Sequence, residues 1–510
     1  MTIISQPRTT LQLASAGVEV GPAPQRVLLV GQMTSGLATP GELVEMIDND
    51  TNTPGSYFGS NSMVASVIRA FKRINQQTEL DVLPLSDNGS GVAREVTITY
   101  AGTATESGEF KLNVAGEKFV VPIASGTTAA ALATATAALI NGSSNNAFTA
   151  AALAAVVTLT AVHPGKVANG YNVGVSGMVA GVTHAVAETV AGAGDPILTS
   201  ILDGLDKRYQ GVVWPYAEDT LPIREFLEAR FAAENKVIDG VAFTAAVDSA
   251  SNLVTAFDSI NSQVLVVFGD KANAETSYIG PAQPIPGHDK AALFAAARAL
   301  RLTPGAAIGN LLTSQAGLDQ FGGPALASLP YFNTVLPLPA PGTGRGFTDQ
   351  EIENLFDVGV SVMGTNVNGS NGLVGEVVTT AQTDPAGNPD PTFGFLNFVD
   401  TMSVVREFFF SNFKTRFAQS RLTEGALAAG RDIANALSIR AFTESLYARL
   451  ASPDFVLTQD GPVALDFFKS NLSVTLDLST GTVQLVMFVP IVTQLRTIIG
   501  TIKIAFSTNG

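Results

Sequence analysis

The chain has 510 residues, of which 46% are hydrophobic and 14% are charged. This composition predicts a folded protein of several domains and argues against intrinsic disorder. A formal net charge of −15 argues against nucleic-acid binding, which needs clustered Lys and Arg, and the lack of any cysteine excludes disulfides and thiolate chemistry.

No stretch has the pattern of a targeting or membrane segment. The amino terminus, MTIISQPRTTLQLASAGVEV, lacks a basic region followed by a continuous apolar run, so we predict no secretory signal. The longest stretch without Asp, Glu, Lys or Arg, residues 119–165, contains the polar run NGSSNNA, which would be costly in lipid. We therefore expect no direct membrane insertion.

The first 24 residues have little periodicity and are predicted to form an extended arm. Residues 25–90 are predicted to be the first part of a core. The nearly all-apolar run RVLLVGQ at 26–32 predicts a strand that is buried on both faces. Apolar residues recur at helical spacing over 58–75, with Ser60 or Asn61 as the expected cap, and a further strand is expected over 79–85. This opening is βαβ-like.

The composition changes at about Gly91, where turn-rich strand patterns begin. Strands are predicted over 93–102 and 109–124, the latter broken by a tight turn at AGE, and an alanine-rich helix follows from Thr127. Because this segment has its own turn chemistry and interrupts a βαβ pattern, residues 91–190 are predicted to be an inserted, peripheral α+β domain.

Strands and helices alternate again over residues 191–342, which predicts a middle α/β domain with a parallel sheet. The strands are expected at 211–216, 239–246 and 263–269, and an amphipathic helix at 220–236. Trp214 lies in the VVWPY run of the first of these strands and is expected in the core.

A proline-rich connector, LPLPAPGTG, leads to a carboxyl-terminal core domain at 343–490. It is predicted to contain helices at 398–419 and 431–449 and strands at 471–478 and 481–488. The fold class is therefore multidomain α/β and α+β, with a mixed-sheet core, flanking helices, the inserted domain and extended terminal arms.

The last residues, 491–510, are predicted to be an arm that forms a strand. From Arg496 onward, four apolar residues fall on one side of a period-2 pattern: Ile498, Ile502, Ile504 and Phe506. Burying so few side chains does not offset the entropy of ordering the arm, so its strand needs a sheet to join. The pattern leaves open whether that sheet belongs to this chain or to another.

The sequence offers no catalytic, cofactor or metal site. The histidines are His163, His184 and His288, and none has a metal-ligand spacing from another. The G-x-S-x-G, P-loop and G-x-G-x-x-G signatures are absent. Three carboxylates cluster around TTAQTDPAGNPDP, namely Glu376, Asp384 and Asp390, but the intervening proline and glycine favour a solvated turn over a cation site or an acid/base pair. We therefore predict a protein that is not an enzyme.

Several segments together resemble the tail sheath proteins of contractile-tailed, Mu-like bacteriophages, in order and spacing across most of the chain. The segments are QRVLLVGQ, FGSNSMVASVIRAFKRINQQTELDVLPL, TITYAGTATESGEFKLNVAGEKFVVPIASGTTAAALATATAALINGSS, VHPGKVANGYNVGV, KVIDGVAFTAA, VVTTAQTDPAGNPD and VPIVTQLRTIIGTIKIAF. The amino-terminal arm matches the family's usual start poorly.

The resemblance implies a structural subunit that polymerises in helical rings around a tail tube and contracts to drive the tube through a host envelope during genome delivery. It implies a virion tail protein, assembled in the host bacterial cytoplasm, whose partners are itself, the tail tube protein, and the baseplate and tail terminator proteins. The family's middle domain is called subtilisin-like from its fold alone, and this chain lacks the Asp/His/Ser order of that activity. No cofactor is implied.

The resemblance further implies that both terminal arms lend strands to sheets in neighbouring subunits. The residues expected to do so are Ile3, Ile4, Val18 and Val20 in the amino-terminal arm, and Arg496, Ile498, Ile502, Ile504 and Phe506 in the carboxyl-terminal arm. The inner wall is expected to meet the tube through few, mostly polar contacts, with Arg406, Lys414 and Arg416 as candidates.

Two other classes compete with this interpretation. An acidic, cysteine-free chain rich in Ala, Thr and Gly is also typical of a secreted surface-layer or adhesin protein, but repeated β modules and a secretion signal are not visible. An α/β hydrolase lacks its nucleophile.

Overall fold

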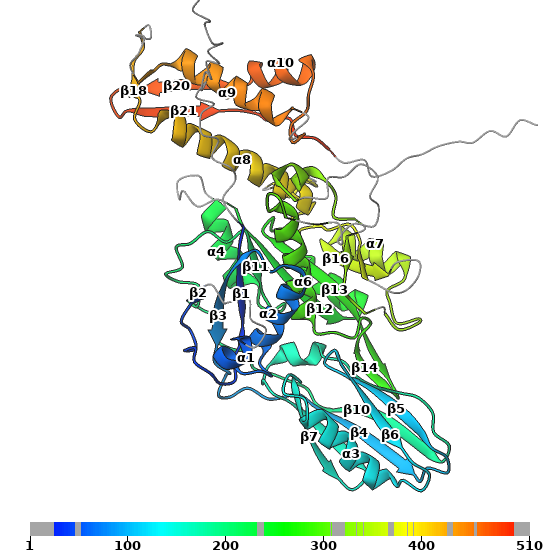
Figure 1. The fold of residues 1–510 in the computed structure, drawn as a ribbon. Helices are drawn as coiled ribbons and strands as arrows, with labels where there is room; N and C mark the ends of the chain where they lie inside the picture. The colour runs from blue at the N-terminus through cyan, green and yellow to red at the C-terminus, as the bar shows by residue number, and fades with distance from the viewer. Residues whose placement is uncertain are drawn as a thin grey trace, which may run out of the picture. The chain divides into compact units, whose positions relative to one another are not determined.

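A computed structural model describes the chain as two compact units (Figure 1). The described residues are 25–45, 53–231, 239–306, 308, 322–332, 334–339, 341–365, 372–384, 386–390, 392–425, 432–452 and 456–493. Of these, residues 25–400 form one unit, the amino-terminal unit, and residues 401–493 form the other, the carboxyl-terminal unit.

The amino-terminal unit is built on a parallel sheet. Its strands, in spatial order, are β3 (Glu79–Leu85), β1 (Arg26–Gln32), β11 (Gly211–Val213), β12 (Val241–Asp248), β13 (Leu265–Glu275) and β16 (Val360–Thr365). At its margins, β2 (Val44–Glu45) pairs antiparallel with β3, and β17 (Gly372–Val374) pairs antiparallel with both β16 and β15 (Val335–Leu336). The central strands are apolar because both faces of the sheet are covered.

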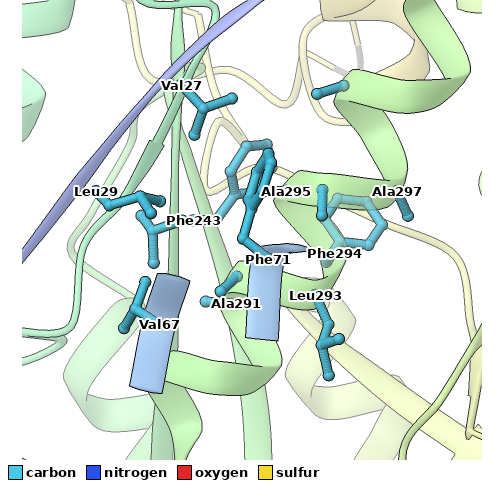
Figure 2. Close-up of a cluster of buried hydrophobic side chains, with 14 of the residues drawn as sticks. Val27, Leu29, Val67, Phe71, Phe243, Ala291, Leu293, Phe294, Ala295 and Ala297 are labelled. Atoms are coloured by element: carbon cyan, nitrogen blue, oxygen red, sulfur yellow. The ribbon is translucent and has the colours of Figure 1, made fainter. Parts of the chain in front are cut away.

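Alternate residues of β1 face opposite layers of helices. Val27 and Leu29 belong to the cluster that contains the buried side chains of α2 (Met63–Ile74) and α6 (Gly287–Leu302), as Figure 2 shows. Leu28 and Val30 belong to the cluster on the other face. That face is covered by α4 (Leu221–Phe231), α5 (Ala250–Phe257) and α7 (Asp349–Asp357).

The helix α6 is buried along almost its whole length, from His288 to Leu302. Its small alanine side chains let it pack closely against α2 on one side and against β11 and β12 on another. The short helix α1 (Thr53–Phe58) precedes α2 and contacts it.

Residues 95–190 have a hydrophobic cluster of their own, between two groups of strands and α3 (Ala129–Asn141). One group is a four-stranded antiparallel sheet of β10 (Val182–Val190), β4 (Glu95–Gly102), β8 (Val156–Ala161) and β7 (Phe148–Leu153), in that order. The other consists of β6 (Glu117–Ile123), β5 (Gly108–Val114) and β9 (Val173–Ser176).

This segment is joined to the rest of the unit through a shared sheet. The strand β9 pairs with β14 (Tyr278–Pro281), which in turn pairs with β13 of the parallel sheet. The 3-10 turn η1 (Lys166–Gly170) also contacts β12. The boundaries at 91 and 190 stay predictions.

The carboxyl-terminal unit consists of helices and a hairpin. The helices are α8 (Leu396–Phe417), whose first residues belong to the other unit, α9 (Ala436–Leu450) and α10 (Pro462–Ser470). The strands β20 (Ser473–Asp477) and β21 (Thr482–Val486) form an antiparallel hairpin, and β18 (Arg421–Leu422) pairs with β19 (Ile433–Ala434).

The structure confirms the mixed α/β fold class and most of the predicted elements. Two details were wrong. The cap of α2 is Ser62, not Ser60 or Asn61, because the Ser62 hydroxyl accepts from the Ala65 N–H. The helix α9 begins at Ala436 rather than Arg431, because Asn435 forms a capping box with Ser438.

The predictions for the two terminal arms cannot be followed in the structure. The amino-terminal residues Ile3, Ile4, Val18 and Val20 lie outside the described residues. The carboxyl-terminal residues Arg496, Ile498, Ile502, Ile504 and Phe506 also lie outside them.

Candidate assembly surfaces

The helix α8 carries all three residues predicted to face a tube, but they do not form one row. Lys414 and Arg416 are exposed in its last turn, whereas Arg406 is half-buried. At 3.6 residues per turn, Lys414 and Arg416 project about 160° apart. Their role in tube contact stays a prediction.

The position of α8 is fixed at its beginning by a buried ion pair in the amino-terminal unit. The Arg298 Nε of α6 lies 3.1 Å from Asp400 Oδ1 and 3.2 Å from Asp400 Oδ2, and Nη2 donates to Oδ1 at 2.5 Å. The Tyr331 hydroxyl donates to Asp400 Oδ2 at 2.5 Å. Both ionic side chains are nearly inaccessible, 6% exposed for Arg298 and 0% for Asp400, so each charge depends on the other.

The electrostatics of this cluster follow from burial and pairing. Burial lowers the pKa of the Arg298 guanidinium, but the Asp400 carboxylate more than offsets this effect, so the pKa is raised overall. Burial also raises the pKa of Tyr331, and Asp400 adds to that shift. The Arg298 guanidinium therefore stays charged across the physiological pH range, and its ion pair with Asp400 anchors the first residues of α8.

The later turns of α8 carry an aromatic row that packs against α9. Phe409, Phe413 and Phe417 stack in sequence, with ring centroids 6.1 and 6.2 Å apart. Phe442 of α9 meets Phe417 edge-on at 5.4 Å. Because residues four apart share a helix face, this row holds α8 and α9 together.

The hairpin of β20 and β21 offers sheet edges. Within the described residues, each of these strands pairs only with the other, so each has a second, unpaired edge. The turn is stabilised by Asp477, whose carboxylate accepts from the Ser479 hydroxyl and from the Ser479 and Thr480 N–H groups. These hydrogen bonds, above all those from Ser479, lower the pKa of Asp477 to about 2.

An apolar patch lies on the carboxyl-terminal unit beside α10. Val463 is 83% exposed and Phe467 is 50% exposed. A cavity of about 460 Å³ is lined by Val463, Phe467, Pro462 and Pro490 among others. Grouped apolar exposure of this kind is typical of a surface that binds another protein.

The acidic segment near residue 384 forms a hydrogen-bonded turn. The Asp384 carboxylate accepts from the Ala386 and Asn388 N–H groups at 2.9 and 2.8 Å, and Asp390 accepts from the Thr392 N–H at 2.9 Å. The side chains of Asn388 and Thr392 are the main cause of the lowered pKa of Asp384 and Asp390, respectively. The arrangement agrees with the solvated turn favoured by the sequence.

Each of the three histidines has different contacts. His163 Nδ1 lies 2.8 Å from Asp87 Oδ1, and His163 Nε2 accepts from the Met63 N–H at the start of α2. His184 meets the Phe110 ring edge-on at 5.0 Å, and His288 is buried at the start of α6.

The described residues contain neither a metal-binding cluster nor a helix suited to span a membrane. No three His, Cys, Asp or Glu side chains in the described ranges come together as a set that could hold a metal ion. None of the described helices is both long enough and apolar enough to cross a bilayer.

Sequence reasoning missed the Arg298–Asp400 cluster, the apolar patch and the helices α5, α6 and α10. One signal for the cluster was present, because the alanine-rich segment of α6 carries Lys290, Arg298 and Arg301. Cations in so apolar a helix indicate buried partners, although the segment does not name them.

The chain is similar to one tail sheath protein over most of its length. It is 23% identical over 435 residues to the Mu-like prophage FluMu tail sheath protein of Haemophilus influenzae, and the match covers 83% of this chain and 82% of that protein. No protein-family model matches the chain. The curated relative confirms the resemblance to Mu-like tail sheath proteins.

Solved sheath structures are also similar in part. The sheath tail protein of Desulfitobacterium hafniense is 12% identical with a TM-score of 0.44, and the match covers 97% of this chain and 99% of that one. The helical sheath of the anti-feeding prophage in its contracted state is 10% identical with a TM-score of 0.46, and the match covers 98% of this chain and 99% of that one.

Proposed function

We propose that this protein is the structural subunit of a contractile tail sheath, which polymerises in helical rings around a tail tube. The observation that carries the proposal is the match to the FluMu tail sheath protein, which extends over 83% of this chain rather than over one domain. The sequence shows no combination of a nucleophile, a general base and an orienting acid, which agrees with a structural role.

The sheath subunits associate through their terminal arms. An arm strand pairs with a free sheet edge of a neighbouring subunit, and the hairpin of β20 and β21 provides such edges. Main-chain hydrogen bonds then supply the stability that an isolated arm lacks. The apolar patch of Val463 and Phe467 is covered by a second subunit.

The carboxyl-terminal unit faces the tube, and residues 91–190 lie on the outside of the sheath. Contacts to the tube are few and mostly polar, because a sheath holds its tube before firing and slides past it afterwards. The baseplate and tail terminator proteins bind the ends of the polymer. The sheath assembles in the host cytoplasm, belongs to the virion tail, and contracts to drive the tube through the host envelope for genome delivery.

Negative-stain electron microscopy of the purified full-length chain tests the proposal. Striated tubes, formed by the chain alone or together with its tail tube protein, are the expected result. Two-dimensional sheets would instead indicate a secreted surface-layer or adhesin protein, and discrete particles under both conditions would refute assembly.

A further inference from the structure

A cavity of about 380 Å³ lies at the carboxyl ends of the strands β11 and β12. Its walls are the segment that follows β11, the end of β12, the helix α5, the 3-10 turn η1 and the first residues of α6. In parallel sheets of this kind, ligands bind outside the carboxyl ends of the strands, near the point where the strand order reverses. Here the order reverses at β1, which pairs with β3 on one side and with β11 on the other.

Two residues that line this strand-end pocket each carry a buried polar atom that has no hydrogen-bond partner among the described residues. The atoms are the hydroxyl of Tyr216, a residue 1% exposed, and Nδ1 of His288, a residue 3% exposed. Both rings are held in place: Tyr216 packs edge-on against Trp214 at 5.7 Å, and His288 against Tyr171 at 5.6 Å. Buried polar atoms without a partner are rare in proteins, and two in residues that line the same pocket indicate a polar ligand.

The charges on the pocket wall favour a cation over an anion. Three carboxylates, from Asp195, Glu218 and Asp248, face a single ammonium group, that of Lys166. Lys166 pairs with Glu218, and Asp248 accepts from the Ser249 N–H and the Asn252 side chain.

Asp195 and Asp248 are the two pocket carboxylates without an ion pair among the described residues, and Asp195 is the one whose pKa is shifted by burial. It accepts the Lys166 N–H at 2.6 Å, and in the described part of the chain it forms no ion pair. Burial raises the pKa of Asp195, which means that its charged form is under-stabilised. An ammonium group in the pocket would supply the missing charge.

The remaining wall is apolar and suits an alkyl chain rather than a bare ion. Leu253 and Phe257 of α5 line it together with alanines of β12. The described residues also offer no three-ligand set for a metal ion. We propose that the strand-end pocket binds a small alkyl diamine, with one ammonium on Asp195, the methylene groups on Leu253 and Phe257, and the other polar end at Tyr216 and His288.

Titration calorimetry of the full-length protein with 1,4-diaminobutane tests this proposal, with 1-butanol and an equal ionic strength of NaCl as comparisons. Saturable heat is expected from the diamine alone. Asp195→Asn should weaken binding about tenfold or more, because it removes a charged hydrogen-bond acceptor, and Tyr216→Phe should weaken it several-fold.

Asp466→Asn, on the exposed face of α10, is the matched control and should bind as the unchanged protein does. Circular dichroism and the melting temperature of each variant without diamine report whether it is folded. Heat that NaCl reproduces, or equal affinity in Asp195→Asn and Asp466→Asn, would overturn the proposal. Tube formation is scored separately by microscopy, so this test is independent of the sheath function.

Discussion

Replacing Asp400 by alanine is expected to be among the most destabilising single changes in the amino-terminal unit. The change leaves the Arg298 guanidinium, 6% exposed, without its counter-ion. Breaking a buried ion pair from one side costs about 3–5 kcal/mol of unfolding free energy. The Tyr331 hydroxyl also loses its acceptor, and a hydrogen bond of this kind contributes about 1 kcal/mol.

Urea denaturation followed by circular dichroism measures these costs. Asp400→Ala should lower the free energy of unfolding by about 4 kcal/mol, whereas Tyr331→Phe should lower it by about 1 kcal/mol. Glu275→Gln is the matched control, because it breaks the exposed ion pair between Glu275 and Arg345, whose side chains are 44% and 23% exposed, respectively. Exposed pairs of this kind contribute about 0–1 kcal/mol to the free energy of unfolding.

A double variant separates the lost charge pair from lost packing. Arg298→Met combined with Asp400→Leu removes both charges and fills similar volume, so it should recover most of the stability lost in Asp400→Ala. If Asp400→Ala costs no more than Glu275→Gln, the pair does not anchor α8 and the reasoning fails.

Four other outcomes are expected. Removing residues from Arg496 onward, or the substitution Ile502→Asp, should give a folded monomer, with native-like ellipticity and monomeric sedimentation, because the arm strand pairs with another subunit. Loss of ellipticity would instead indicate that the strand belongs to the core of its own subunit. Normal tubes would contradict both the donated strand and the core strand. Neutralising the three basic residues of α8 should weaken co-assembly with the tube and its salt dependence, and unchanged co-sedimentation would remove them as tube contacts. Replacing residues 91–190 by a short linker should leave tube formation intact under the microscope, and an insoluble product would show that the segment belongs to the core. Burial lowers the pKa of His288, so below about pH 6.5 the unfolded chain binds more protons than the folded chain, and the melting temperature should decrease as the pH is lowered. The substitution His288→Phe should make this dependence of the melting temperature on pH weaker. An unchanged dependence would exclude His288 as its source.

Local chemistry in the sequence was enough to predict many single elements. The apolar run at 26–32 is the strand β1, and the AGE turn is a tight hairpin in which Ala115 and Gly116 have φ of 47° and 83°. The spacing of apolar residues likewise predicted α2. These features depend on neighbours a few residues away, so the sequence alone carries them.

Contacts between distant residues were decided only by the tertiary structure. The pairing of β9 with β14 joins residues 173–176 to residues 278–281, and the ion pair of Arg298 and Asp400 spans 102 residues. The strand-end pocket likewise gathers Asp195, Tyr216 and His288 from separate elements. Periodicity says which side of a strand or helix is apolar, but it does not say which element covers that side. Which element covers that side depends on how all the elements pack together. The same holds for the buried charges, because each needs a partner that only the folded chain provides.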